Sequence, residues 1–175
     1  MTIDESRTFK PTCIAVLTVS DTRKAADDTS GDILAARIEG AGHHIAARTI
    51  VKDDANLLEK QLREWIADDG VDAIVSTGGT GLTGRDVTPE ALDRVKDKDI
   101  PGFGELFRWI SYQTIGTSTV QSRALAVLAG GTYIFALPGS NGAVKDGWDG
   151  ILAEQLDSRN RPCNFVDLMP RLREV

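Results

Sequence analysis

A glycine-rich turn between an apolar run and a helix start is the feature that most constrains the fold of this chain. Val71-Asp-Ala-Ile-Val75 is predicted to form a short buried strand. Thr88-Pro89-Glu90 predicts a helix start, with Thr88 as the N-cap and proline at the first helical position. The segment 76–87 between them contains four glycines, at positions 78, 79, 81 and 84. Strand, glycine turn and helix in this order expose backbone N–H groups to an anion at the carboxyl edge of a sheet.

Two familiar phosphate-binding motifs fit this segment only in part. Gly79-Thr-Gly81-Leu-Thr-Gly84 matches the pattern G-x-G-x-x-G, but the helix start comes after the glycines and no acidic residue follows at the end of the next strand, as a dinucleotide site requires. The spacing of a P-loop is also present, but Arg85-Asp86 stands where that motif needs lysine followed by serine or threonine. The segment therefore predicts an anion site of another kind, or else a flexible turn whose aspartate is only a cap.

Apolar runs alternate with helical patterns along the whole chain. Besides 71–75, strands are predicted at 12–20, 45–51 and 132–137, and a helix is expected around Val120, Ala124 and Val127-Leu128, with an extended or irregular tail at 162–170. This alternation predicts an α/β fold of three layers, a doubly wound, mostly parallel sheet with helices on both faces. The length of 175 residues suits one domain over 1–175, with its core at about 12–165.

Four strand ends of this predicted sheet carry polar residues. They are Ser20-Asp21, Asp53-Asp54, the loop 78–84, and the turn 138–142. Because ligands of such sheets bind beyond the carboxyl ends of the strands, we expect these segments to meet along one edge. The residues expected to bind the substrate or its phosphate are Ser20, Asp21, Gly78, Gly79, Thr80, Gly81, Arg85, Ser122, Arg123, Pro138, Gly139 and Ser140.

Carboxylates, glycine N–H groups and arginines at one edge suit phosphoryl or nucleotidyl transfer. Such reactions need alignment and cancellation of charge on phosphate oxygens, usually by Mg²⁺. Asp53 and Asp86 are the candidate catalytic residues and the candidate Mg²⁺ ligands. Arg85 and Arg123 offer planar donors to phosphate. The alternatives are a helix cap for Asp53, a solvated helix face for Arg123 and a helix cap for Ser140.

Composition and residue counts exclude several classes of function. The net charge is −6, from 26 acidic and 20 basic residues, which argues against a general nucleic-acid binder. No apolar run reaches membrane-spanning length and no secretory signal is visible, so no membrane partner is expected. Cys13 and Cys163 lie far apart without metal-ligand spacing, which predicts reduced thiols in a cytoplasmic protein. The only histidines, at 43 and 44, are predicted to begin a strand, far from the ligand edge.

Several motifs of this chain resemble those of one known family. Ser76-Thr-Gly-Gly-Thr-Gly81 with Arg85-Asp-Val-Thr-Pro-Glu-Ala91 resembles the signature of the MoaB/MogA family of molybdenum-cofactor biosynthesis proteins. Pro101-Gly-Phe-Gly-Glu105 and Leu137-Pro-Gly139 are similar to further motifs of that family, and the resemblance runs from about Cys13 to Phe165. Three segments look specifically like the MoaB branch, namely 27–31, 115–123 and 155–165.

The resemblance implies a doubly wound α/β domain that binds molybdopterin, a pterin bearing a dithiolene and a terminal phosphate. In active family members, Mg²⁺- and ATP-dependent adenylylation of that phosphate releases pyrophosphate. The two essential aspartates of the family correspond to Asp86 and Asp53, with Asp54 as the alternative if the register shifts by one residue. The resemblance also implies a homo-oligomer, either a trimer or a hexamer.

The function expected from the resemblance is therefore a molybdopterin adenylyltransferase with ATP and molybdopterin as substrates. The alternative is a non-catalytic carrier or storage protein that binds molybdopterin. A self-associating scaffold and a nucleotide-binding oxidoreductase are two weaker alternatives. The first is disfavoured because the chain has no interaction tail, and the second because the helix starts late and the strand-end acid is missing.

Overall fold

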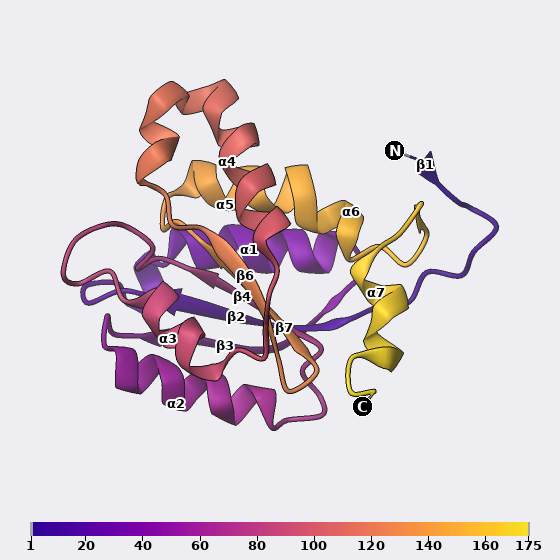
Figure 1. Ribbon diagram of the computed structural model, residues 1–175, viewed down its shortest axis with the longest axis horizontal. Helices are drawn as coiled ribbons and strands as arrows, with labels where there is room; N and C mark the ends of the chain where they lie inside the picture. Colours follow the sequence, from indigo (N-terminus) through magenta and orange to yellow (C-terminus); the bar gives the residue numbers. More distant parts are fainter. Residues whose placement is uncertain (1, 175) are drawn as a thin grey trace.

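Six strands form one central sheet in the computed structural model of this chain, which describes residues 2–174 (Figure 1). The strand order is β3-β2-β4-β7-β6-β5, and the first four strands are parallel. The strands are β2 (Cys13–Val19), β3 (His44–Val51), β4 (Ala73–Thr77), β5 (Lys98–Asp99), β6 (Leu125–Ala129) and β7 (Thr132–Leu137). The four strands predicted from the sequence are confirmed, one with identical bounds and three with bounds that differ by one or two residues.

Helices cover both faces of the sheet, as Figure 1 shows. One face carries α1 (Thr29–Gly40), α4 (Pro101–Ile115) and α5 (Asn141–Gly147), and α5 continues through the π-helical segment η3 (Trp148–Leu152) into α6 (Ala153–Gln155). The other face carries α2 (Ala55–Ile66) and α3 (Thr88–Val95). The predicted three-layer, doubly wound, mostly parallel α/β fold is thereby confirmed.

Strand β2 stabilises this arrangement because it packs against helices on both of its faces. Its side chains alternate between the two hydrophobic cores, so that Ile14 and Val16 pack with α1 while Leu17 and Val19 pack with α2. All four are at most 4% exposed. A strand buried on both faces needs apolar residues at successive positions, which is the near-continuous apolar run seen in the sequence.

The helix expected around Val120–Leu128 is wrong. The structure has a 3-10 helix, η2 (Gly116–Gln121), followed by strand β6, which pairs antiparallel with β7. Gly130 and Gly131 join the two strands with φ values of 57° and 90°, which suit a two-residue hairpin turn. Pairing with β7 outweighed the local helical spacing because it buries Ala126–Ala129 in the two cores.

The N-terminal strand and the C-terminal segment both lie at one end of the sheet (Figure 1). Strand β1 (Thr2–Ile3) pairs antiparallel with β8 (Asn160–Arg161). The tail expected to be irregular contains a short helix, α7 (Phe165–Leu168), which begins where the Asn164 side chain accepts a hydrogen bond from the Asp167 N–H at 2.8 Å. Two 3-10 turns complete the elements, η1 (Ala25–Asp27) and η4 (Met169–Arg171). Among residues 2–174, no helix is both long and apolar enough to cross a bilayer.

Candidate functional site

The glycine loop after β4 depends on residues without side chains. Gly78 and Gly79 have φ values of 105° and 64°, in the region that favours glycine. A Cβ atom on Gly78 would lie 2.2 Å from the Val19 carbonyl oxygen, and one on Gly79 would lie 2.4 Å from Thr88 Oγ1. Within residues 2–174, the backbone N–H groups of Gly79 and Thr80 donate to no protein acceptor. These two N–H groups are therefore available to an anion.

The start of α3 holds this loop in place. The structure begins the helix at Thr88 with Val87 as N-cap, so the predicted N-cap role of Thr88 is wrong by one residue. The Thr88 hydroxyl donates instead to the Gly78 carbonyl at 2.9 Å, and the Thr88 N–H donates to the Gly79 carbonyl at 3.0 Å. Thr88 is thus occupied with the backbone of the loop and not with the first turn of its own helix.

Asp86 closes the glycine loop on itself. Its Oδ2 accepts hydrogen bonds from the Thr83 hydroxyl at 2.6 Å and the Thr83 N–H at 2.9 Å. These bonds hold the pKa of the Asp86 carboxyl below its usual range. A Cβ atom on Gly81 would lie 2.7 Å from Asp86 Oδ2, so the carboxylate lies directly against the loop backbone. Asp86 is therefore a fixed, ionised group at the edge of the anion site.

Asp53 adjoins the same loop from the end of β3. The cap of α2 is Asp54, whose carboxylate accepts from the N–H groups of Asn56 and Leu57, so the helix-cap alternative for Asp53 is excluded. A Cβ atom on Gly79 would lie 3.1 Å from Asp53 Oδ1. Burial and the nearby carboxylates of Asp21 and Asp86 raise the pKa of Asp53. Three carboxylates from three strand ends thus act on one another electrostatically.

Arg85 joins the glycine loop to the end of β2. Its guanidinium donates to both carboxylate oxygens of Asp21, at distances of 2.6 to 2.9 Å. This contact lowers the pKa of Asp21. The guanidinium is exposed, so it can also meet an anion from solvent.

Arg123 lies behind the loop and contacts its backbone. Nε donates to the Gly81 carbonyl and Nη2 to the Asp86 carbonyl, both at 2.7 Å, while Nη1 pairs with Glu90 at 2.5 Å. The predicted alternative of a solvated helix face is wrong, since Arg123 lies between η2 and β6 and is only partly exposed. Its donors are committed to protein oxygens, so its observed contacts position the loop.

A cavity of about 470 Å³ opens between the glycine loop, the turn after β7, and α4 with η2. This volume is in the range of small-molecule sites. Its polar side includes nine of the predicted residues, namely Gly78, Gly79, Thr80, Gly81, Asp86, Ser122, Pro138, Gly139 and Ser140. Its other side comprises Phe107, Ser111, Ile115, Ser118, Gln121 and Ala143, none of which was predicted as a site residue.

The unpredicted wall had a signal in the sequence. Phe107, Ser111 and Ile115 are spaced four residues apart and so share one face of α4. That spacing marks a helix face, but it does not show that the face borders a ligand cavity. The remaining predicted residues surround the loop but do not line the cavity. They are Ser20, Asp21, Asp53, Arg85 and Arg123.

Ser20 and Ser140 have local structural contacts. Ser20 Oγ accepts from the N–H groups of Thr22 and Arg23 at 3.3 and 3.2 Å. Ser140 is the N-cap of α5, and its hydroxyl accepts from the Ala143 N–H at 3.2 Å, which agrees with the cap alternative while leaving Ser140 on the cavity wall. Ser20 therefore shapes the loop after β2, whereas Ser140 faces the site.

The carboxylates at this loop suit a magnesium ion whose remaining ligands come from a substrate and water. No group of three or more His, Cys, Asp or Glu side chains in the part of the chain that the structure describes is arranged to hold a metal ion alone. Asp53 and Asp86 nevertheless adjoin the same loop, and burial together with the carboxylates of Asp21 and Asp86 raises the pKa of Asp53. Mg²⁺ commonly binds through one or two carboxylates together with phosphate oxygens and water. The residues therefore fit Mg²⁺ that arrives with a phosphate ligand.

A second hollow of about 400 Å³ lies between β3 and α2. Its lining includes Lys52, Lys60 and Glu64 but no glycine. We assign the site to the cavity at the glycine loop, because of these two hollows it is the one that combines free backbone N–H groups with a fixed carboxylate.

Comparison with known proteins identifies related proteins over most of the chain. The family model described as "Probable molybdopterin binding domain" matches residues 15–158. Molybdenum cofactor biosynthesis protein B of Escherichia coli K12 is 51% identical over 160 residues, which cover 91% of this chain and 94% of the relative. A crystal structure of a molybdenum cofactor biosynthesis protein B is 35% identical with a TM-score of 0.86 and covers 97% of this chain and all of its own. The tungsten cofactor synthesizing protein MoaB from Pyrococcus furiosus is 39% identical with a TM-score of 0.74, over 83% of this chain and 92% of that one.

Proposed function

This chain belongs to the MoaB/MogA family of molybdenum cofactor biosynthesis proteins, and from that premise we propose that it adenylylates molybdopterin. In this reaction an oxygen of the terminal phosphate of molybdopterin forms a bond to the α-phosphorus of ATP. The bond from that phosphorus to the β-phosphate bridging oxygen breaks, and pyrophosphate leaves. No protein group needs to form a covalent bond, so the protein acts by alignment and electrostatics.

The observation that carries the proposal is the two-sided cavity. One side offers the N–H groups of Gly79 and Thr80 beside the Asp86 carboxylate. The opposite side offers Phe107 and Ile115 with the polar groups of Ser118 and Gln121. Such a cavity matches a ligand with a phosphate at one end and a flat, hydrogen-bonding ring system at the other.

Asp53 and Asp86 are the proposed catalytic residues and the proposed Mg²⁺ ligands. When bound, the ion supplies neutralisation of charge on phosphate oxygens. Asp86 is fixed by Thr83, so its carboxylate needs little reorganisation to act on a ligand. Burial first, and then the carboxylates of Asp21 and Asp86, raise the pKa of Asp53, and a cation bound at this loop would offset the repulsion between these carboxylates.

A carrier or storage protein that binds molybdopterin without reaction is the alternative. The same cavity supports it, because pterin binding needs only the glycine loop and the apolar wall. It is less well supported by the carboxylates, since two acidic groups beside a phosphate weaken binding unless a cation accompanies the ligand.

Pyrophosphate release from Mg-ATP, measured with and without molybdopterin, tests the proposal. Release that requires the pterin supports adenylyl transfer. Molybdopterin that binds without pyrophosphate release would overturn the enzymatic proposal and leave the carrier. A protein that binds no molybdopterin would overturn both.

Location and assembly complete the proposal. Cys13 and Cys163 are both free thiols, which supports the reducing environment of the cytoplasm. A homo-oligomer, trimer or hexamer, is supported by exposed apolar side chains along α4 and η2, namely Leu106, Trp109, Tyr112, Ile115 and Val120. Light scattering coupled to size exclusion measures the mass directly, and a monomer at micromolar concentration would contradict the oligomer.

A further inference from the structure

A network of buried polar side chains lies behind the cavity wall formed by Pro138–Ser140. Asp28 and Ser30 are both 0% exposed, and neither lines the cavity. Asp28 Oδ2 accepts from Thr18 Oγ1 at 2.8 Å and from Arg48 Nη2 at 2.7 Å. A carboxylate removed from water destabilises the fold unless cationic and hydrogen-bonding partners compensate. A further cationic neighbour of Asp28, Arg23, connects this carboxylate to the cavity wall.

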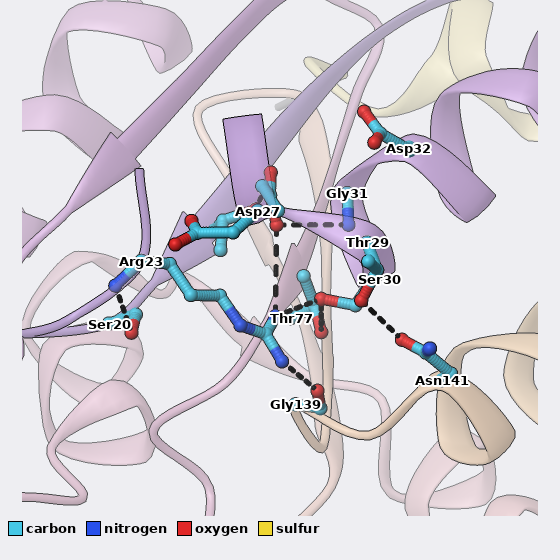
Figure 2. A network of polar contacts seen from close by, with 12 residues as sticks. Ser20, Arg23, Asp27, Thr29, Ser30, Gly31, Asp32, Thr77, Gly139 and Asn141 are labelled. Carbon is cyan, nitrogen blue, oxygen red and sulfur yellow. Dashed lines mark hydrogen bonds and ion pairs between the residues drawn. The ribbon is translucent and has the colours of Figure 1, made fainter. Parts of the chain in front are cut away.

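Arg23 links this network to the cavity wall (Figure 2). Its Nη2 donates to the Gly139 carbonyl at 2.8 Å. Its Nη1 donates to Ser30 Oγ and lies 3.7 Å from Asp28 Oδ1. The guanidinium is therefore fixed on one side by buried groups and reaches the backbone of the wall with the other.

Two neighbours of Gly139 are held in the same manner, as Figure 2 also shows for Asn141. Thr77 Oγ1 donates to the Pro138 carbonyl at 3.2 Å. Thr29 Oγ1 donates to Asn141 Oδ1 at 3.0 Å. Three of the four residues in the segment 138–141 are thus held from behind, while Pro138, Gly139 and Ser140 face the cavity.

The spacing between the two glycine walls of the cavity is tight at this point. A Cβ atom on Gly139 would lie 3.3 Å from Gly78 Cα. A shift of the segment 138–141 by a few tenths of an ångström therefore changes the gap in which the ligand must fit, since packed walls cannot absorb it.

We propose that Arg23 is a positioning residue, which is anchored by Asp28 and Ser30 and sets the distance between Gly139 and the Gly78–Gly79 loop. In this role Arg23 controls the affinity of the cavity without touching its ligand. The identity of that ligand as molybdopterin rests on the proposed function, whereas the control of the wall does not.

Arg23→Met, with Arg48→Met as matched control, tests the role. Each variant removes one cationic partner of Asp28 and leaves the other, and only Arg23 contacts the wall. Amide hydrogen exchange of residues 138–141 is measured in the ligand-free protein, and molybdopterin binding by titration calorimetry. We expect Arg23→Met to accelerate the exchange and to weaken binding about tenfold, which is the loss for one charge-assisted hydrogen bond. Arg48→Met should change both less than Arg23→Met does, because it loses a bond to Asp28 but keeps the Arg23 contact with Gly139.

Arg23→Lys is the second variant. Its single ammonium reaches either the buried groups or the Gly139 carbonyl but cannot span both as a guanidinium does, so partial recovery of affinity is expected. Wild-type exchange and affinity in Arg23→Met would overturn the proposal, and so would equal losses in Arg48→Met, which would mean a general loosening around Asp28. If wild type itself binds no molybdopterin, the proposed function fails while the exchange data still decide the positioning role.

Discussion

Asp21 holds Arg85 in a bidentate ion pair, with an Nε–Oδ2 distance of 2.9 Å and an Nη2–Oδ1 distance of 2.7 Å. The pair spans from the end of β2 to the loop after β4, so two strand ends share one cation. Both side chains are exposed, so the pair adds little to the stability of the fold. An anionic ligand that uses Arg85 has to compete with Asp21 for the guanidinium.

Replacing Arg85 and Asp21 one at a time separates the role of Arg85 in ligand binding from its role in the ion pair. Arg85→Gln removes the cation, and we expect kcat/KM for Mg-ATP to fall about tenfold, the loss for one charge-assisted hydrogen bond. Asp21→Asn breaks the same pair but leaves the arginine available, so kcat/KM should be retained or increased. Steady-state kinetics of both variants measure these changes. An equal loss of kcat/KM in Asp21→Asn would mean that activity requires the intact ion pair and not the free guanidinium.

Asp53→Asn should stabilise the protein while it abolishes turnover. The pKa of Asp53 is raised, so the folded protein holds this proton to higher pH than the unfolded chain does. The contribution of Asp53 to stability therefore falls as the pH rises from the usual aspartate value to the raised one, and the penalty is complete at neutral pH. After discount for solvent screening we expect a gain of about 0.5 kcal/mol at pH 7, or about 1–2 °C in Tm.

Asp54→Asn is the control for that experiment, because asparagine keeps the cap of α2. Turnover should survive in this variant with little change in Tm. Calorimetric melts at pH 4 and pH 7 measure the stability effect. A lower Tm for Asp53→Asn at pH 7 would show that the carboxylate stabilises the loop.

Gly79→Ala should destabilise the glycine loop. Its φ of 64° and the 2.4 Å approach of a Cβ atom to Thr88 Oγ1 leave no room for a side chain. The expected loss in the free energy of unfolding is about 1–3 kcal/mol. Gly84→Ala in the same loop meets nothing within 4 Å and has no positive φ, so it should be neutral or slightly stabilising. Equal denaturation midpoints for the two variants would contradict this assignment.

Arg123→Met should loosen the loop from behind. The arginine holds the carbonyls of Gly81 and Asp86, and their loss is expected to cost about 2 kcal/mol of unfolding free energy. Glu90→Gln removes only the ion pair and keeps both loop contacts, so its effect should be smaller. Urea unfolding measures both. Turnover that falls in Arg123→Met but not in Glu90→Gln would agree with a positioning role, and wild-type turnover in Arg123→Met would contradict it.

The local sequence pattern was sufficient to predict the layers of this fold but not its antiparallel strands. The run from Cys13 to Val19 is apolar at nearly every position, and only a strand buried on both faces requires that. Leu125–Ala129 has equally apolar residues, but its strand state depends on pairing with β7 across the Gly130-Gly131 turn. The two adjacent glycines between apolar runs were the available signal for a hairpin.

The candidate site was predicted where its residues follow strands. Gly78–Gly81, Asp86 and Pro138–Ser140 all line the cavity because parallel topology brings strand ends together. Phe107 and Ile115 were missed, since the position of α4 over the cavity depends on packing between distant segments. Arg23 was missed for a similar reason, because its contact with Gly139 joins residues 116 positions apart in sequence.

Mass spectrometry of the pterin product tests adenylyl transfer at Asp86 most directly. Wild type and Asp86→Asn are each incubated with molybdopterin and Mg-ATP, after circular dichroism has shown that both are folded. We predict a pterin heavier by one adenylyl group with wild type, formed only when both substrates are present, and none with Asp86→Asn. Unmodified molybdopterin recovered from wild type that binds it, or the adenylylated product formed at the wild-type rate by Asp86→Asn, would contradict this function for the site.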